Sequence, residues 1–155
     1  MEDKRLRASQ LAGLAAMEKE ARGLLEAVSE AINIEEIKPL LDRLLSEHEE
    51  RMAALSQEVG RMEGGEGAFC MKPPLGAYVD GFTDLAPDDG SKAGLEKLLV
   101  NERFVRDVYA GIRTEALGKA GGLVRRFLEQ ERVHVGEVEG LVKARAWERF
   151  ILPVR

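Results

Sequence analysis

The stretch from Val124 to Leu141 reads VRRFLEQERVHVGEVEGL, and its pattern decides the fold. Apolar residues recur in it every three or four positions, which is the spacing of one face of an α-helix. Two polar residues, Glu131 and His134, stand on that same face. Residues three apart on a helix are neighbours, so this carboxylate and this imidazole can reach one metal ion. A single Glu-x-x-His match is a weak signal in a chain so rich in glutamate, and its weight depends on the other helices.

Three further segments have the same helical spacing, and one polar residue interrupts the apolar face of each. The interrupting residues are Glu18, His48 and Glu102. The three faces comprise Leu11, Leu14, Glu18, Ala21, Leu25, Val28 and Ile32; Leu41, Leu45, His48, Met52, Leu55 and Val59; and Leu95, Leu98, Glu102, Val105, Tyr109, Ile112 and Ala116. We therefore expect an all-α chain with four helices. Their expected ranges are about 5–32, 34–62, 91–117 and 121–146, with a long connection at 64–94.

The polar interruptions are predicted to meet at one height. In an antiparallel helix pair, residues equally far from the turn lie level, because each residue rises about 1.5 Å. Glu18 and His48 are centred on Asn33, a predicted turn. Glu102 and His134 are likewise centred on a predicted glycine-rich turn.

The start of the second helix is open between two positions. A start near Ile34 keeps Glu18 and His48 level. Pro39 suits the first turn of a helix, and a start there would offset the pair by roughly 8 to 9 Å.

Composition limits the class of protein. A chain of 155 residues suits one domain, 1–155, and 5% aromatic with 33% charged residues is typical of a helical bundle. The net charge of −5, with lysine and arginine scattered, argues against nucleic acid as a partner. No apolar run approaches the roughly 20 residues that cross a bilayer, so we expect no membrane partner. The lone Cys70 fits a reducing compartment, and we expect a cytoplasmic protein.

Three carboxylates buried together would cost several kcal/mol per charge unless cations, protons or water compensated them. A bound metal ion supplies that charge. Carboxylate and imidazole ligands suit iron or manganese, with zinc as an alternative, and are too hard for copper(I).

These features resemble the ferritin-like di-iron carboxylate proteins, which include ferritins, bacterioferritins and rubrerythrins. In that family each hairpin supplies a Glu on one helix and Glu-x-x-His on the next. The resemblance covers nearly the whole chain and implies an antiparallel four-helix bundle of two hairpins with metal between them. It also implies oxidation of Fe(II) by dioxygen or peroxide. Five of the six family positions are matched, by Glu18, His48, Glu102, Glu131 and His134.

The sixth position departs from the family, because Leu45 stands where the pattern has Glu. Glu47 and Glu49 lie about 100° around the helix from His48, and either would reach inward only from a bent or π-bulged helix. Three outcomes stay open: a shifted site for two ions, a site that keeps one ion, and a remnant that holds none.

Two functional hypotheses follow. The first is a ferritin-like metal-binding protein, with two iron ions or one, acting as a ferroxidase- or peroxidase-type oxidoreductase. The alternative is a metal-free helical bundle that binds a protein partner through the apolar connection at 69–85; Leu45 favours it. On this reading His48 is a core histidine, and Glu18 and Glu102 are rim residues with solvated carboxylates. A homodimer is a further expectation, since ferritin-like chains often pair.

Overall fold

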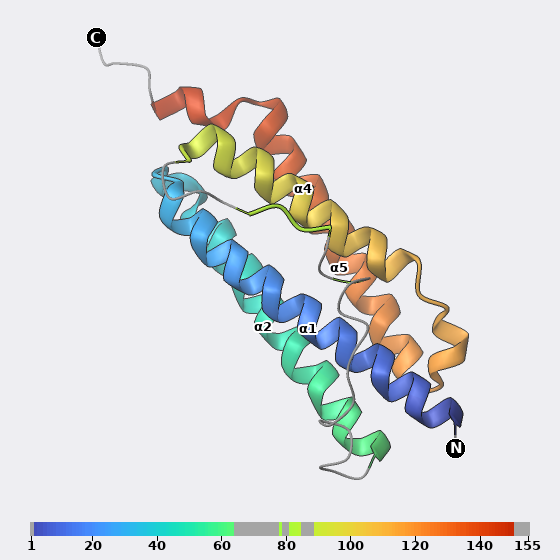
Figure 1. Cartoon of the computed structure of the whole chain (residues 1–155). Coiled ribbons are helices and arrows are strands. Elements are labelled where there is room, and N and C mark those ends of the chain that lie inside the picture. Colours follow the sequence, from blue (N-terminus) through green and yellow to red (C-terminus); the bar gives the residue numbers. More distant parts are fainter. Residues whose placement is uncertain (1, 64–77, 79–80, 85–88, 151–155) are drawn as a thin grey trace.

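The computed structural model describes residues 2–63, 78, 81–84 and 89–150, and this described part is helical with no strand (Figure 1). The all-α class is therefore confirmed. The long helices are α1 (Glu2–Ala31), α2 (Lys38–Glu63), α4 (Ser91–Ala110) and α5 (Ala120–Lys143). The short 3₁₀ helices are η1 (Glu35–Ile37), η3 (Thr114–Leu117) and η4 (Ala146–Phe150). No helix in these ranges has the length and apolar character needed to cross a membrane.

The four long helices form two antiparallel hairpins that pack side by side (Figure 1). α1 packs chiefly on α2 and α4 on α5, while α1 also contacts α4 and α2 contacts α5. Since α2 and α4 run in the same direction, the connection between them has to span the length of the bundle. Its described parts lie against the helices: the Tyr78 hydroxyl is 3.3 Å from Gln10 Nε2 of α1, and the Thr83 amide donates to Asn101 Oδ1 of α4 at 2.8 Å. The predicted docking segment 69–85 falls mostly outside the described residues.

Two helix boundaries differ most from the expected ranges. α2 begins at Lys38, so Pro39 occupies its first turn and the later of the two anticipated starts is correct. The third helix was expected to reach Leu117, but α4 ends at Ala110, and residues 114–117 form the separate turn η3. Glycine shapes the turn between η3 and α5: Gly118 has φ +62°, a conformation that side chains disfavour. A Cβ on Gly121 would lie 2.2 Å from the Thr114 carbonyl oxygen, so η3 packs directly on the start of α5.

The apolar core consists of two clusters, one toward each end of the bundle. One is built around residues such as Leu25, Ile32 and Leu41. The other includes Leu14 and Leu55. On α2, α4 and α5 the segment between the two clusters carries buried polar residues, and these form the layer that holds the candidate site.

Candidate metal centre

The structure brings all five predicted site residues together in this polar layer. α1 contributes one residue, α2 one, α4 one and α5 two, and none is more than 1% exposed. They are Glu18, His48, Glu102, Glu131 and His134. Their apolar neighbours on each helix are buried too, so the three-and-four spacing placed these polar groups on the core face correctly.

Four ligand atoms form a closed ring at the centre of the layer. His48 Nε2 lies 3.1 Å from Glu102 Oε1 and 3.7 Å from Glu131 Oε1. His134 Nδ1 lies 3.3 Å from Glu102 Oε1 and 3.0 Å from Glu131 Oε1. One nitrogen or oxygen from each of the four residues falls within 4.8 Å of all the others. A tetrahedral ion with bonds of about 2.0–2.1 Å places its ligand atoms about 3.3 Å apart, so these spacings fit one metal ion.

Each histidine also has its outer ring nitrogen on a carboxylate. His48 Nδ1 pairs with Glu18 Oε1, and His134 Nε2 pairs with Glu47 Oε2. In the neutral ring the outer N–H donates to that carboxylate, which leaves the inner nitrogen as an acceptor facing the centre. Histidines that bind metals in proteins are held in this way, with the second nitrogen donating to a carboxylate or carbonyl.

Arg51 is a sixth polar residue of the layer, and it was not among the predicted site residues. Its guanidinium is 1% exposed and places Nη1 2.7 Å from Glu131 Oε1 and 3.2 Å from Glu18 Oε2. Nη2 lies 3.1 Å from His134 Nδ1, and the Cζ atom lies 5.9 Å from the centre of the Phe127 ring.

A signal for Arg51 was present in the sequence. The buried face of α2 runs through Leu41, Leu44, His48, Arg51, Leu55 and Val59, whereas the predicted face contained Leu45 and Met52. Both of those residues are half-buried. The buried face proceeds in steps of three or four residues throughout, and it places a cation one turn after His48.

The hairpin turn explains why Glu18 meets both His48 and Arg51. The centre of the turn between α1 and α2 falls between residues 34 and 35, which puts Glu18 level with Arg51. His48 is then offset by three residues, or roughly 4.5 Å, instead of the 8 to 9 Å expected for a late helix start. The two carboxylate oxygens of Glu18 span this offset, one contacting Arg51 and the other His48.

Leu45 stands at the position where the family has a glutamate, and Glu47 and Glu49 follow it on α2. Leu45 is half-buried and packs on the apolar cluster around Leu41. Glu47 contacts the outer nitrogen of His134 from the flank of α2, which is α-helical throughout, and its carboxylate is not part of the ring of ligand atoms. Glu47 can contact His134 Nε2 because this nitrogen points away from the centre of the ring of ligand atoms. Glu49 instead pairs with Arg22 at 2.7 Å on the exposed side of the bundle.

The charges in the layer shift the pKa values of the histidines and acids. Burial lowers the pKa of His134, but Glu102 and Glu131 outweigh burial and raise it to about 9. Arg51 carries only donors, so its 3.1 Å contact with His134 Nδ1 is a hydrogen bond only when that nitrogen is unprotonated. Burial likewise lowers the pKa of His48, yet Glu102 and Glu18 raise it well above its usual value.

The carboxylates respond to the same charges. Burial raises the pKa of Glu18, but Arg51 and His48 hold it below its ordinary value. Burial and the neighbouring Glu102 together raise the pKa of Glu131. With both histidines protonated, three cations face the three fully buried carboxylates, so the layer is charge-balanced without a metal ion.

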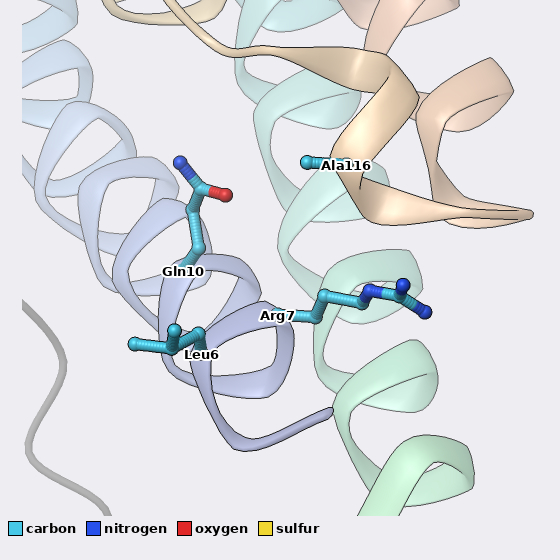
Figure 2. Close-up of a pocket in the computed structure, with 4 residues that line it drawn as sticks. All are labelled: Leu6, Arg7, Gln10 and Ala116. Carbon is cyan, nitrogen blue, oxygen red and sulfur yellow. The ribbon is translucent and has the colours of Figure 1, made fainter. Parts of the chain in front are cut away.

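The layer reaches the surface beside His134. A pocket of about 240 Å³ lies between α2 and α5, and its wall includes both Glu47 and His134. The other lining residues are Arg43, Gln130, Val133 and Glu137. A second pocket, of about 290 Å³, lies between the N-terminal part of α1 and η3 and is lined by Leu6, Arg7, Gln10 and Ala116 (Figure 2). No residue of the polar layer lines this second pocket, whereas His134 lines the first.

Comparisons of the chain with protein-family models, with curated proteins and with solved structures gave no match. Fold and site together define an all-α protein whose buried His and Glu cluster could hold a metal ion.

Proposed function

We propose that this protein binds one divalent transition-metal ion between its two hairpins, with His48, Glu102, Glu131 and His134 as ligands. The observation that carries this proposal is the ring of two nitrogens and two oxygens spaced 3.0 to 3.7 Å apart. Carboxylates on both outer histidine nitrogens support it, since they orient the rings toward the centre. Glu18 becomes a positioning residue for His48 instead of a ligand.

Iron is the metal we favour. Two imidazole nitrogens with two carboxylate oxygens suit Fe(II), and also Mn(II) or Zn(II). The resemblance to the ferritin-like di-iron carboxylate proteins points to iron and to oxidation of Fe(II) by dioxygen or peroxide. We propose one ion instead of two because Leu45 replaces a family carboxylate, and because Arg51 already supplies a positive charge to Glu18 and Glu131.

Metal analysis tests the proposal. Protein purified without chelator or affinity metal, and then titrated with Fe(II) under anaerobic conditions or with Zn(II), is expected to bind one ion per chain. Glu131→Gln and His134→Gln remove one ligand each and should lower the affinity at least about tenfold, since each loses a metal bond. Glu49→Gln is the matched control, because Glu49 follows His48 directly but faces outward. Wild-type protein that takes up no ion, or ligand variants that bind like the control, would sink the proposal.

The oxidation chemistry needs its own measurement. Fe(II) in air is expected to oxidise faster with wild-type protein than with Glu131→Gln at equal iron. Equal rates, together with a bound ion, would leave metal binding in place and remove the oxidoreductase assignment.

A metal-free helical bundle that serves as a protein-interaction module is the second candidate, and Arg51 favours it. The guanidinium and two protonated histidines suffice to balance the three buried carboxylates. A melting temperature that is identical with added metal and with chelator would support this candidate, because an ion bound only by the folded state must stabilise it.

A further inference from the structure

Arg51 contacts two of the atoms that would bind the metal ion. Its Nη2 lies 3.1 Å from His134 Nδ1, and its Nη1 lies 2.7 Å from Glu131 Oε1. A metal ion needs the neutral imidazole, and a neutral imidazole nitrogen has a single lone pair. His134 Nδ1 can therefore bind a metal ion only after it has given up both its proton and its contact with Arg51.

The charge of the guanidinium adds to this conflict. A metal ion at the centre of the ring would bring two positive charges close to a buried cation, in surroundings that screen charge poorly. A carboxylate oxygen has more than one lone pair, so Glu131 can still share with Arg51, but His134 cannot. The conflict is thus sharpest at one atom, His134 Nδ1.

We propose that Arg51 is a resident cation that a metal ion displaces from His134, so that this residue sets the metal affinity and makes the site reversible. The inference rests on the proposed metal-binding function. In the metal-free state Arg51 neutralises the buried carboxylates and stabilises the bundle. In the loaded state the ion takes over that charge at Glu131 and His134, and the protein exchanges its ion without unfolding.

The displaced guanidinium has other partners within reach. Glu18 Oε2 lies 3.2 Å from Nη1 and is outside the ring of ligand atoms. Tyr109 donates its hydroxyl to the same Glu18 oxygen, and the Phe127 ring lies beneath the guanidinium. Arg51 can therefore leave His134 while it keeps an anion and an aromatic face, so that displacement does not strand a buried charge.

Titration with Co(II) or Zn(II) of the wild-type protein and of Arg51→Met tests the inference. Met has a similar length and no charge, so the variant frees His134 Nδ1 and adds one net negative charge to the site. We expect it to bind Co(II) at least tenfold more tightly than wild type. Arg22→Met is the matched control, because it removes the same charge from a surface ion pair with Glu26 and Glu49 and should leave the affinity within about twofold.

Two outcomes overturn the inference in distinguishable ways. If wild type binds Co(II) and Arg51→Met binds it equally or less tightly, Arg51 does not compete and only the inference fails. If neither protein binds Co(II) or Zn(II), the proposed function fails as well.

A second measurement covers the case in which Arg51→Met does not fold. A crystal structure of wild-type protein with Zn(II) is expected to place Arg51 Nη2 beyond hydrogen-bond distance of His134 Nδ1, with Nη1 still on Glu18. Zinc bound to His134 with Arg51 in its metal-free position would overturn the proposal.

Discussion

Removal of Arg51 should destabilise the metal-free protein strongly. The substitution Arg51→Met takes away a buried guanidinium that contacts Glu131 at 2.7 Å and Glu18 at 3.2 Å, and both carboxylates are 0% exposed. Loss of one partner from a buried ion pair costs about 3–5 kcal/mol, because the remaining charge stays buried without compensation. A domain of this size has a free energy of unfolding of about 5–15 kcal/mol, so the variant should fold but lose a large share of its stability.

Urea unfolding in the presence of chelator measures this loss. Helix content is followed by circular dichroism, and the single tryptophan, Trp147, reports by fluorescence on the apolar cluster around Leu25. At about 2 kcal/mol per molar urea, a loss of about 3–5 kcal/mol lowers the midpoint by about 1.5–2.5 M. The two probes should give the same midpoint if unfolding is two-state.

A double-mutant cycle isolates the pairing with Glu131. Glu131→Gln removes the charge that Arg51 compensates, so Arg51→Met combined with Glu131→Gln should be less destabilised than the sum of the two single variants. The expected coupling is about 1–3 kcal/mol, the range for neighbouring groups in one network. A midpoint shift below about 0.5 M for Arg51→Met, or additive single variants, would show that the buried ion pair does not hold the metal-free protein together.

Three further predictions concern other parts of the molecule. Tyr109→Phe removes a buried hydroxyl that donates to Glu18, and it should lower the free energy of unfolding in urea by about 1.5–3 kcal/mol. Tyr78→Phe, at a half-buried hydroxyl 3.3 Å from Gln10 Nε2, should lower it by less than about 1 kcal/mol. Equal losses would contradict the Glu18 contact. The free energy of unfolding of the metal-free protein should fall as the pH rises from about 6.5 to about 9. Burial lowers the pKa of His134, but Glu102 and Glu131 outweigh burial and raise it to about 9, so protonation of this residue stabilises the folded state only below that value. His134→Gln should flatten the dependence of stability on pH, and an unchanged slope would refute the pKa shift. Gly121→Ala should destabilise the fold by about 1–3 kcal/mol or more, since its Cβ would lie 2.2 Å from the Thr114 carbonyl oxygen. Gly136→Ala, in open space on α5, should stabilise the fold by about 0.5–1 kcal/mol. The thermal midpoints of both variants check the turn geometry.

The apolar spacing alone located four long helices and the buried position of all five expected site residues. Apolar spacing does not specify which of two adjacent residues faces the core, because that depends on packing against the other helices. Either Leu44 or Leu45 continues a helical face from Leu41, and only contact with the other helices buries Leu44 and Arg51 instead of Leu45 and Met52. η3, which follows the end of α4, packs on the start of α5 through the close approach of two backbones at Gly121, and this is likewise a tertiary contact.

The sequence by itself determined that Glu18, His48, Glu102, Glu131 and His134 share the core, because helical periodicity fixes which side of each helix a residue faces. Only the tertiary structure decided what these residues do to one another. The offset of the hairpin turn brought Arg51 level with Glu18, and the ring orientation of His134 brought Glu47 to its outer nitrogen. The physical reason is that periodicity specifies direction around a helix to within a face, whereas ligand geometry depends on ångström-scale heights and rotamers that the packing of all four helices sets together.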